Sequence, residues 1–165
     1  MLALQKQAAK ISHLNLREEK HGEETVLALD IKISFDMQNA YLEDLKPGLK
    51  ASFYGAAEGA TADMLDRGHL PRLLHPEIGE IKFAAQMLKC PVTIFYEKKK
   101  VDILGDVNNF KLHCKDGGTV STSLRVQILP SPEEAGVLAG LLGLDVKVTI
   151  QPGEEQAPAG EEAPE

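Results

Sequence analysis

The sequence has no tryptophan, and its aromatic residues make up only 5% of 165 residues. A broad platform of aromatic side chains for stacking nucleic-acid bases is therefore not expected. The chain also has only two cysteines, Cys90 and Cys114, which are fewer than a secreted domain stabilised by disulfides normally carries. They do not have the Cys-x-x-Cys spacing of a zinc site, so we expect two free thiols and no bound metal.

Long apolar runs are absent too. The longest apolar segment, residues 135–150, is interrupted by glycines and then by Asp145. It is shorter than the roughly 18–20 uninterrupted residues that a membrane span needs. The first residues of the chain show neither the charged-then-apolar pattern nor the cleavage site of a secretory signal. We therefore expect a soluble intracellular protein with no membrane partner.

Catalytic signatures are missing as well. The sequence has no phosphate-binding loop, no Gly-x-Ser-x-Gly turn and no His-Glu-x-x-His helix, so we expect a protein that is not an enzyme and uses no cofactor. The best candidate for chemistry is residues 63–77, which have the groups for divalent-metal binding or acid–base catalysis. These groups belong to Asp63, Asp66, His69, His75 and Glu77. A solvated polar loop is the simpler interpretation, and we favour it.

The acidic charge is concentrated at one end of the chain. The net charge is −7, but residues 153–165 hold five of the 25 acidic residues and no basic one. Without that segment, 20 acidic residues face 18 basic ones, so the rest of the chain is close to neutral. The segment has two prolines and no large apolar side chain, which predicts a disordered acidic tail.

Two segments have the period-two alternation of a half-buried β-strand. They span residues 27–35 and residues 120–128, and every second residue in each is apolar or, once, threonine. This pattern predicts strands with one buried face and one solvated face. A β-hairpin is predicted over residues 90–106, with its turn in the charged sequence EKKK.

A short helix is predicted after each alternating strand. The first starts at Asn39 as its N-cap, and the second is capped by Ser131 with Pro132 at its first position. The apolar stripe of the second helix is expected to be Val137, Leu138, Leu141 and Leu142. A further strand is predicted after each helix, over residues 49–54 and 145–150.

The same order of elements therefore occurs twice. Residues 11–55 and residues 107–151 each read as strand, turn, strand, helix, strand, on either side of residues 56–106. We expect one α+β domain over residues 1–152, dominated by an antiparallel sheet or a partly open barrel with two short helices. An internal ββαβ repeat is one explanation of the pattern. The other is that two ordinary ββαβ stretches resemble each other because they obey the same physics.

The strongest cationic feature is a run of three lysines at the predicted hairpin turn. Single-strand binding proteins combine lysine contacts to phosphate with base stacking on aromatic rings, so this hairpin is our candidate nucleic-acid site. We expect two further basic residues to extend it. The candidate residues are Lys98, Lys99, Lys100, Phe95, Tyr96, Lys111 and Arg125. The simpler interpretation is a solvated turn whose charges prevent edge-to-edge strand pairing.

Two segments resemble small uncharacterised proteins encoded by tailed bacteriophages. They read ISHLNLREEKHGEETVLALDIKISFD and VNNFKLHCKDGGTVSTSLRVQ, and the resemblance spans most of residues 11–150. It implies a location in the bacterial cytoplasm and a viral accessory role, either in replication or recombination or in countering host defence. It implies no active site.

We expect a non-enzymatic accessory protein that binds single-stranded nucleic acid in replication or recombination. The alternative is an inhibitor or sequestering protein that counters a host defence system by binding a host protein or a small ligand, and the near-neutral body suits it equally. A host or phage protein bound through the body or the acidic tail is a further expected partner. A homodimer formed by pairing free strand edges is also compatible with the sequence.

Overall fold

The computed structural model describes residues 2–56 and 70–156, without the side chains of residues 155 and 156. Its strands are β1 (Leu4–His21), β2 (Glu24–Gln38), β3 (Tyr54–Gly55), β4 (Arg72–Leu73), β5 (Ile81–Phe83), β6 (Gln86–Tyr96), β7 (Lys99–Cys114), β8 (Thr119–Ile128), β9 (Asp145–Ile150) and β10 (Glu154–Gln156). Its helical segments are η1 (Asn39–Tyr41), α1 (Leu42–Leu45), α2 (Leu49–Phe53) and α4 (Pro132–Gly140). None of the helices in these ranges is long and apolar enough to cross a membrane.

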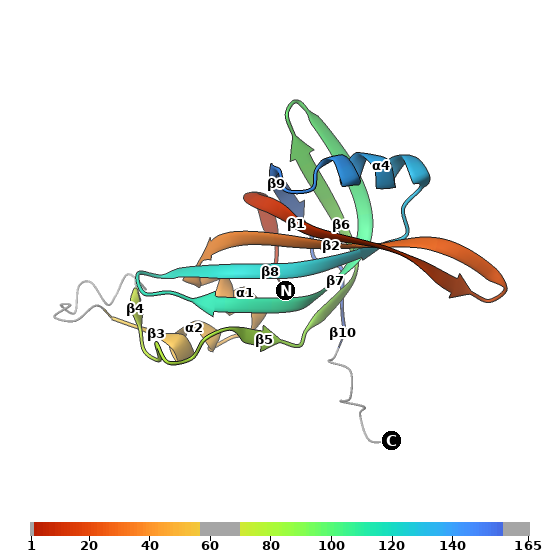
Figure 1. The fold of residues 1–165 in the computed structure, drawn as a ribbon. Helices are drawn as coiled ribbons and strands as arrows, with labels where there is room; N and C mark the ends of the chain where they lie inside the picture. The colour runs from red at the N-terminus through yellow and green to blue at the C-terminus, as the bar shows by residue number, and fades with distance from the viewer. Residues whose placement is uncertain (1, 57–69, 157–165) are drawn as a thin grey trace, which may run out of the picture.

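Six strands form a closed ring. β6, β9, β1, β2, β8 and β7 are hydrogen-bonded in that order, and β6 also pairs with β7, which joins the two ends. All these pairs are antiparallel. β10 pairs with the start of β6 and β5 with the end of β7, so both extend the sheet outside the ring (Figure 1). The expected fold class, a mainly antiparallel sheet or partly open barrel with short helices, is confirmed.

The core lies where the alternating segments meet. β2 and β8 are neighbours, with Ile33 directly opposite Leu124, and both side chains are almost fully buried. The predicted period-two pattern is therefore confirmed for residues 29–35 and 120–128. At the start of the first segment it is wrong, because Ala28 is buried and Leu27 only half-buried. Burying each such aliphatic side chain contributes about 1.5–3 kcal/mol, which makes these two strands the centre of the apolar core.

The β6–β7 hairpin differs from the sequence expectation at both ends. The turn is formed by Glu97 and Lys98 alone, while Lys99 and Lys100 already belong to β7. β7 then continues without a break to Cys114, although two separate strands were expected there. The three lysines are therefore not all at the turn, and their side chains point in different directions.

The helices follow their predictions only in part. Ser131 caps α4 as predicted, with its side chain and that of Glu134 forming a reciprocal capping box. Of the predicted apolar stripe, Leu138 and Leu141 are buried, whereas Val137 and Leu142 are 40% and 50% exposed. Only half of the predicted apolar residues therefore face the barrel.

The first predicted helix has a different start. Asn39 is not an N-cap but is buried, and its side-chain amide donates to the carbonyl of Leu70. Residues 49–53, predicted as strand, form α2 instead, because the chain re-enters helical geometry after Gly48 adopts a φ of 87°. Only Tyr54 and Gly55 are extended, as β3.

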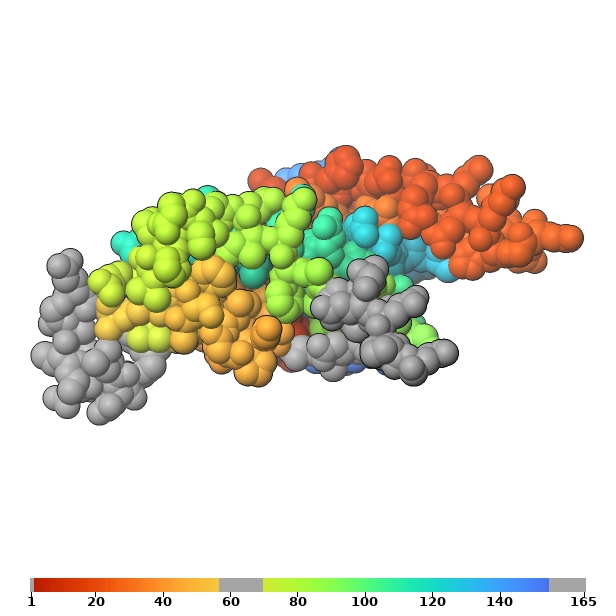
Figure 2. All heavy atoms as spheres, turned by 90° about the horizontal axis from the view of Figure 1, so that it is seen from below, coloured from red at the N-terminus to blue at the C-terminus, as the bar shows by residue number. Residues whose placement is uncertain are grey.

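Helices α1 and α2 cover one face of the sheet formed by β2, β8, β7 and β5. They lie below these strands in Figure 1, and in the view from below they occupy that side together with the segment leading to β5 (Figure 2). Tyr41, Leu45 and Phe53 pack from this side against the core. The opposite face of the same strands carries their polar residues, and none of the described helices covers it.

The two proposed repeat units begin alike and end differently. Their hairpins, β1–β2 and β7–β8, lie side by side through β2 and β8, with Lys32 directly opposite Arg125. Their last elements differ, because α2 stands where the second unit has β9, a member of the ring. The internal repeat therefore stays a prediction, and only the hairpins resemble each other here.

The predicted acidic tail starts with a short strand. Glu154–Gln156 form β10 and pair with Gln86–Leu88 of β6, although disorder was expected from residue 153 onward. Backbone pairing with an open strand end needs no apolar side chain, which is why composition gave no sign of it. The remaining tail residues, 157–165, lie outside the described residues.

Candidate anion-binding surfaces

The seven candidate nucleic-acid residues occupy two separate places. Five of them belong to the β6–β7 hairpin end, whereas Lys111 and Arg125 lie on the polar face of β7 and β8. Lys100 and Lys111 are both on β7, and a strand of this length separates them by about 35 Å. The structure therefore divides the single predicted surface into two.

The first surface, which we call the hairpin cluster, comprises Lys6, Phe95, Lys100 and Lys147. Phe95 of β6 is directly opposite Lys100 of β7 on one side and Lys147 of β9 on the other. From β1, the Lys6 amine lies over the Phe95 ring, 5.1 Å from its centroid. Paired residues of neighbouring strands share a face, so three lysines from three strands surround one partly exposed ring.

Two of the predicted hairpin residues do not join this cluster. Tyr96 packs against the apolar core, and Lys99 is directly opposite Tyr96, so both alternate away from Phe95. Tyr96 therefore contributes to core packing and does not provide a second ring for base stacking. Lys98 is at the turn itself.

Sequence reasoning missed Lys6 and Lys147. Lys147 is the polar member of an alternating strand, so the sequence predicts that its side chain faces solvent. The sequence does not predict that Phe95 lies beside it. The pairing of β9 with β6 brings together residues far apart in the chain. Only one acidic side chain of the described residues contacts the cluster: Asp102, 3.8 Å from the amine of Lys100, with both side chains 63% exposed. Such an exposed ion pair is worth well under about 1 kcal/mol.

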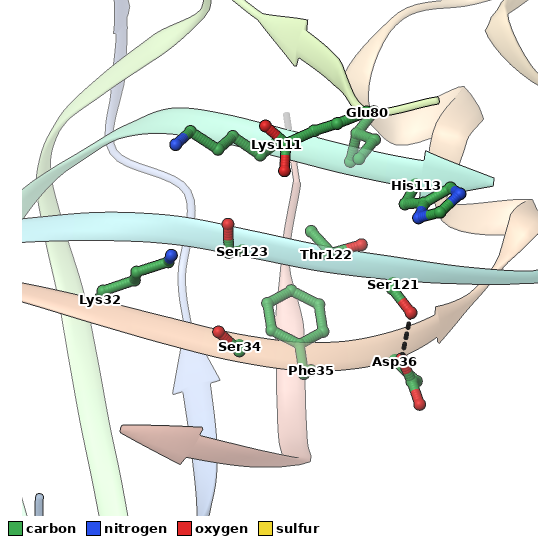
Figure 3. Close-up of a pocket in the computed structure, with 11 residues that line it drawn as sticks. Lys32, Ser34, Phe35, Asp36, Glu80, Lys111, His113, Ser121, Thr122 and Ser123 are labelled. Atoms are coloured by element: carbon green, nitrogen blue, oxygen red, sulfur yellow. Dashed lines mark hydrogen bonds between the residues drawn. The ribbon is translucent and has the colours of Figure 1, made fainter. Parts of the chain in front are cut away.

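The second surface is a groove on the polar face of β2, β8 and β7, which we call the sheet-face groove. It consists of a hollow of about 450 Å³ beside a smaller one of about 230 Å³. Lys32, Lys111 and Ser123 line both hollows, and Arg125 and His13 line the smaller one. Figure 3 shows Lys32 and Lys111 on either side of Ser123, with both amines lying at the same end of the groove.

A β-bulge places Lys111 in this groove. Asn108 is opposite Arg125 and Lys111 is opposite Ser123, so β7 has two residues where β8 has one. Asn109 is the bulged residue, with a left-handed φ of 55° that asparagine adopts more readily than most residues. Strict alternation from buried Val107 would point Lys111 into the core. The extra residue reverses this and turns buried Phe110 inward and Lys111 outward.

Arg125 is held by a chain of hydrogen bonds that crosses the sheet. Its Nε donates to Oδ1 of Asn108 at 2.9 Å, and Nδ2 of Asn108 donates to Oε1 of Gln127 at 2.8 Å. Nε2 of Gln127 donates to Asp30 at 3.1 Å, and Arg17 donates to both carboxylate oxygens of Asp30 at 3.1 Å. The guanidinium of Arg125 is therefore oriented through its Nε, whereas its Nη groups have no hydrogen-bond partner in the described residues.

Asp30 is stabilised in its charged form by the donors of this hydrogen-bonded series. Burial raises the pKa of its carboxyl group, but the hydrogen bonds from Arg17 and Gln127 outweigh burial and leave the pKa below its usual value. Asp30 is therefore ionised at neutral pH and paired with Arg17. The nearby charge of Arg125 acts in the same direction.

Two other carboxylates line the groove. Asp36 accepts a hydrogen bond from Ser121 at 2.8 Å, which Figure 3 shows at the end opposite the lysine amines. Glu80, just before β5, extends its side chain over the groove (Figure 3). The groove is thus polarised, with lysines at one end and the Asp36–Ser121 pair at the other.

The candidate segment for metal binding or acid–base catalysis, residues 63–77, is only partly described by the structure. Asp63, Asp66 and His69 lie outside the described residues, and His75 and Glu77 form an exposed pair 3.5 Å apart. Within residues 2–56 and 70–156, no three histidine, cysteine or acidic side chains are grouped as a metal site would require. Cys90 and Cys114 are free and buried, and burial raises the pKa of both thiols.

No family model, curated protein or solved structure matches this chain. The resemblance to proteins of tailed bacteriophages therefore stays a prediction.

Proposed function

We propose that this protein binds single-stranded nucleic acid without catalysing a reaction, and that the hairpin cluster is the contact surface. The observation that carries this proposal is the partly exposed ring of Phe95, surrounded by Lys6, Lys100 and Lys147. An aromatic ring among cations offers a face for a base and charges for the flanking phosphates, which is the combination that single-strand binding proteins use.

The lysines of the cluster are spaced so that they can contact successive phosphates of one nucleic-acid strand. Lys100, Phe95, Lys147 and Lys6 come from four adjacent strands, β7, β6, β9 and β1, and neighbouring strands are about 4.8 Å apart. The cluster therefore spans roughly 15 Å across the barrel, enough for a few nucleotides. Three phosphate contacts on a single strand predict that affinity falls about twentyfold between 50 and 200 mM salt.

The cluster favours unpaired bases over duplex DNA. In a duplex both faces of each base are stacked on neighbours, so a single protruding ring has nothing to contact without unstacking. The Lys6 amine already lies against the ring, which shows that the face of Phe95 accepts a cation and is accessible. An incoming base would displace this amine toward a phosphate.

Fluorescence anisotropy with labelled single-stranded and double-stranded oligonucleotides tests the proposal. We expect single-strand binding that weakens with salt and weakens about tenfold in Phe95→Ala, because base–aromatic stacking is worth about 1–3 kcal/mol. Phe95→Leu keeps the apolar bulk and should lose nearly as much affinity, whereas Phe95→Tyr should retain it. Equal affinity of the alanine variant and the original protein would contradict the proposal.

The acidic tail supplies a second arm of this test. A chain ending after Gln156 keeps β10 in the sheet and removes Glu161, Glu162 and Glu165. We expect this chain to bind oligonucleotides more tightly, because fewer acidic residues then compete with phosphate for the lysines. Such binding would suit the role in replication or recombination that the phage resemblance implies. No oligonucleotide binding by either chain would instead favour the alternative, binding of a host protein.

A further inference from the structure

We propose that the sheet-face groove binds the phosphoryl group of a small phosphorylated molecule, at a site separate from the hairpin cluster. This inference goes beyond nucleic-acid binding and does not depend on it. It rests on the charges that converge at one end of the groove, on the fixed orientation of one of them, and on the size and polarity of the hollow.

The converging charges are those of Lys32, Lys111 and Arg125. Lys32 and Arg125 are directly opposite each other on β2 and β8, and Lys111 is opposite Ser123, two residues before Arg125. Among the residues that the structure describes, neither lysine amine has a hydrogen-bond or ion-pair partner. A phosphoryl group placed between the two amines would therefore gain contacts without breaking existing ones.

Arg125 adds geometric selectivity. Its Nε is held by Asn108, so the planar guanidinium is already oriented before any ligand arrives. A planar fork that presents two N–H donors matches two oxygens of a phosphoryl group better than a flexible lysine does. The hydroxyl of Ser123, between the two lysines, adds a donor at the same end (Figure 3).

The dimensions and lining of the groove indicate a small and polar ligand. Its larger hollow, about 450 Å³, is within the range of small-molecule sites. Such sites are usually apolar, but here the exposed lining is serine, lysine, histidine and carboxylate. The phenyl ring at the groove, that of Phe35, is only 6% exposed, so the exposed rings there are the small polar imidazoles of His13 and His113.

The acidic end indicates what the rest of the ligand carries. Asp36 is an acceptor at this end (Figure 3), so a hydroxyl or amino group at the far end of the ligand would be favoured there. A sugar phosphate has this arrangement, with a dianion at one end and hydroxyl donors at the other. Inorganic phosphate has only the first part, and we expect it to bind more weakly.

Nuclear magnetic resonance titration of the full-length protein tests this inference. Inorganic phosphate and ribose 5-phosphate are added at constant ionic strength, and the backbone amides of β2, β7 and β8 are followed. We expect saturable shifts confined to the groove, with ribose 5-phosphate binding more tightly. Lys111→Met should weaken binding about tenfold, the loss of one charge-assisted contact. Glu80→Gln should strengthen it, because a free carboxylate is removed from the groove.

Lys100→Met is the matched control, because it removes the same charge from the same strand outside the groove. It should leave phosphate binding unchanged and weaken oligonucleotide binding, whereas Lys111→Met should do the reverse. Thermal unfolding of both variants shows whether the fold is kept, and Glu80→Gln tests the groove without touching β7. Shifts that do not saturate, or an equal loss in both lysine variants, would overturn the proposal. So would a loss of oligonucleotide binding in Lys111→Met, which would make the groove a nucleic-acid contact.

Discussion

The hairpin cluster and the sheet-face groove use the same kinds of residue in different ways. In the hairpin cluster, lysines surround an aromatic ring near the end of the projecting β6–β7 hairpin (Figure 1), and no hydrogen-bond network among the described residues fixes their amines. In the groove, Arg125 is oriented by Asn108 and lies in a concave surface whose phenyl ring, that of Phe35, is buried. The first arrangement tolerates many positions of an extended polyanion, whereas the second favours one compact anion.

The two surfaces also differ in how visible they are in the sequence. Three consecutive lysines are conspicuous, yet consecutive residues of a strand alternate between faces, so only Lys100 joins Phe95. The groove residues Lys32, Lys111 and Arg125 are scattered over more than ninety positions. Lys111 and Arg125 were predicted only as an extension of the hairpin, and Lys32 was not predicted at all. A prominent run of charge is thus a poor guide to which charges act together.

The largest expected effect comes from reversing the charges of the hairpin cluster, which should affect that surface and not the groove. Replacing Lys6, Lys100 and Lys147 with glutamate should weaken single-strand binding by about 100-fold or more at low salt, because three attractive contacts become repulsive. The slope of affinity against salt should become much shallower. Anisotropy over a salt series measures both, and phosphate binding in the groove should be unchanged.

The control for that variant changes the same charge elsewhere. Replacing Lys20, Lys46 and Lys115 with glutamate alters the net charge equally, and all three side chains are exposed and outside the cluster. If this control weakened binding as much as the cluster variant, overall charge rather than the hairpin cluster would explain the affinity.

A second prediction concerns the barrel that both surfaces share. A Cβ on Gly105 of β7 would lie 2.7 Å from a methyl group of Ile128 and 2.8 Å from the carbonyl oxygen of Gln127. Gly105→Ala should therefore cost about 1–3 kcal/mol of unfolding free energy and weaken both kinds of binding together. Gly136→Ala in α4, where a Cβ meets nothing within 4 Å, should stabilise by about 0.5–1 kcal/mol. Urea unfolding of the pair gives the comparison.

A third prediction uses the bulge to separate the two surfaces. Asn109→Val puts a β-branched residue at a φ of 55° and should cost about 1–2 kcal/mol, with weaker phosphate binding and normal oligonucleotide binding. Asn109→Gly should keep both stability and the groove, because glycine adopts this φ without strain. Urea unfolding and the phosphate titration measure the two effects. If valine and glycine behaved alike, the bulge would not position Lys111.

The smallest expected effect is a pH dependence of the network behind the groove. Asp30 has a lowered pKa in the folded protein, so the unfolded chain binds its proton more readily. The stability due to Asp30 is therefore present above its ordinary pKa, near pH 4, and is lost as the pH falls through the lower folded value. In Arg17→Met this acid sensitivity should be reduced. Chemical unfolding between about pH 6 and pH 3 tests it, and identical profiles for both proteins would exclude this role of Arg17.

Local patterns predicted much of the scaffold. The alternation in residues 29–35 and 120–128, the hairpin over residues 90–106 and the Ser131 cap all depend on contacts between near neighbours, and all are present. The misplaced elements have different causes. Asn39 donates to the carbonyl of Leu70, a distant partner, instead of capping a helix. Residues 49–53 form a helix directly after Gly48, whose φ of 87° is a local feature, although their pattern suggested a strand.

The bulge is an intermediate case, because the sequence carried a sign of it. Val107 and Phe110 are both apolar but three residues apart, which no regular strand can bury on one face. One extra residue between them restores the alternation, and this predicts a bulge and the outward direction of Lys111. The partners of Lys111 in the groove remained unpredictable, because the pairing of β2 with β8 and β7 sets them.

The sequence alone determined the kind of protein: a strand-rich chain, with apolar faces at period two and capped turns, because these features follow from side-chain direction and backbone preference within a few residues. The tertiary structure decided which charges meet. Closing six strands into a ring places Lys6 and Lys147 beside Phe95, and Lys32 beside Arg125. Strand order and register are set by the burial of the whole core, so these neighbours are a property of the complete fold.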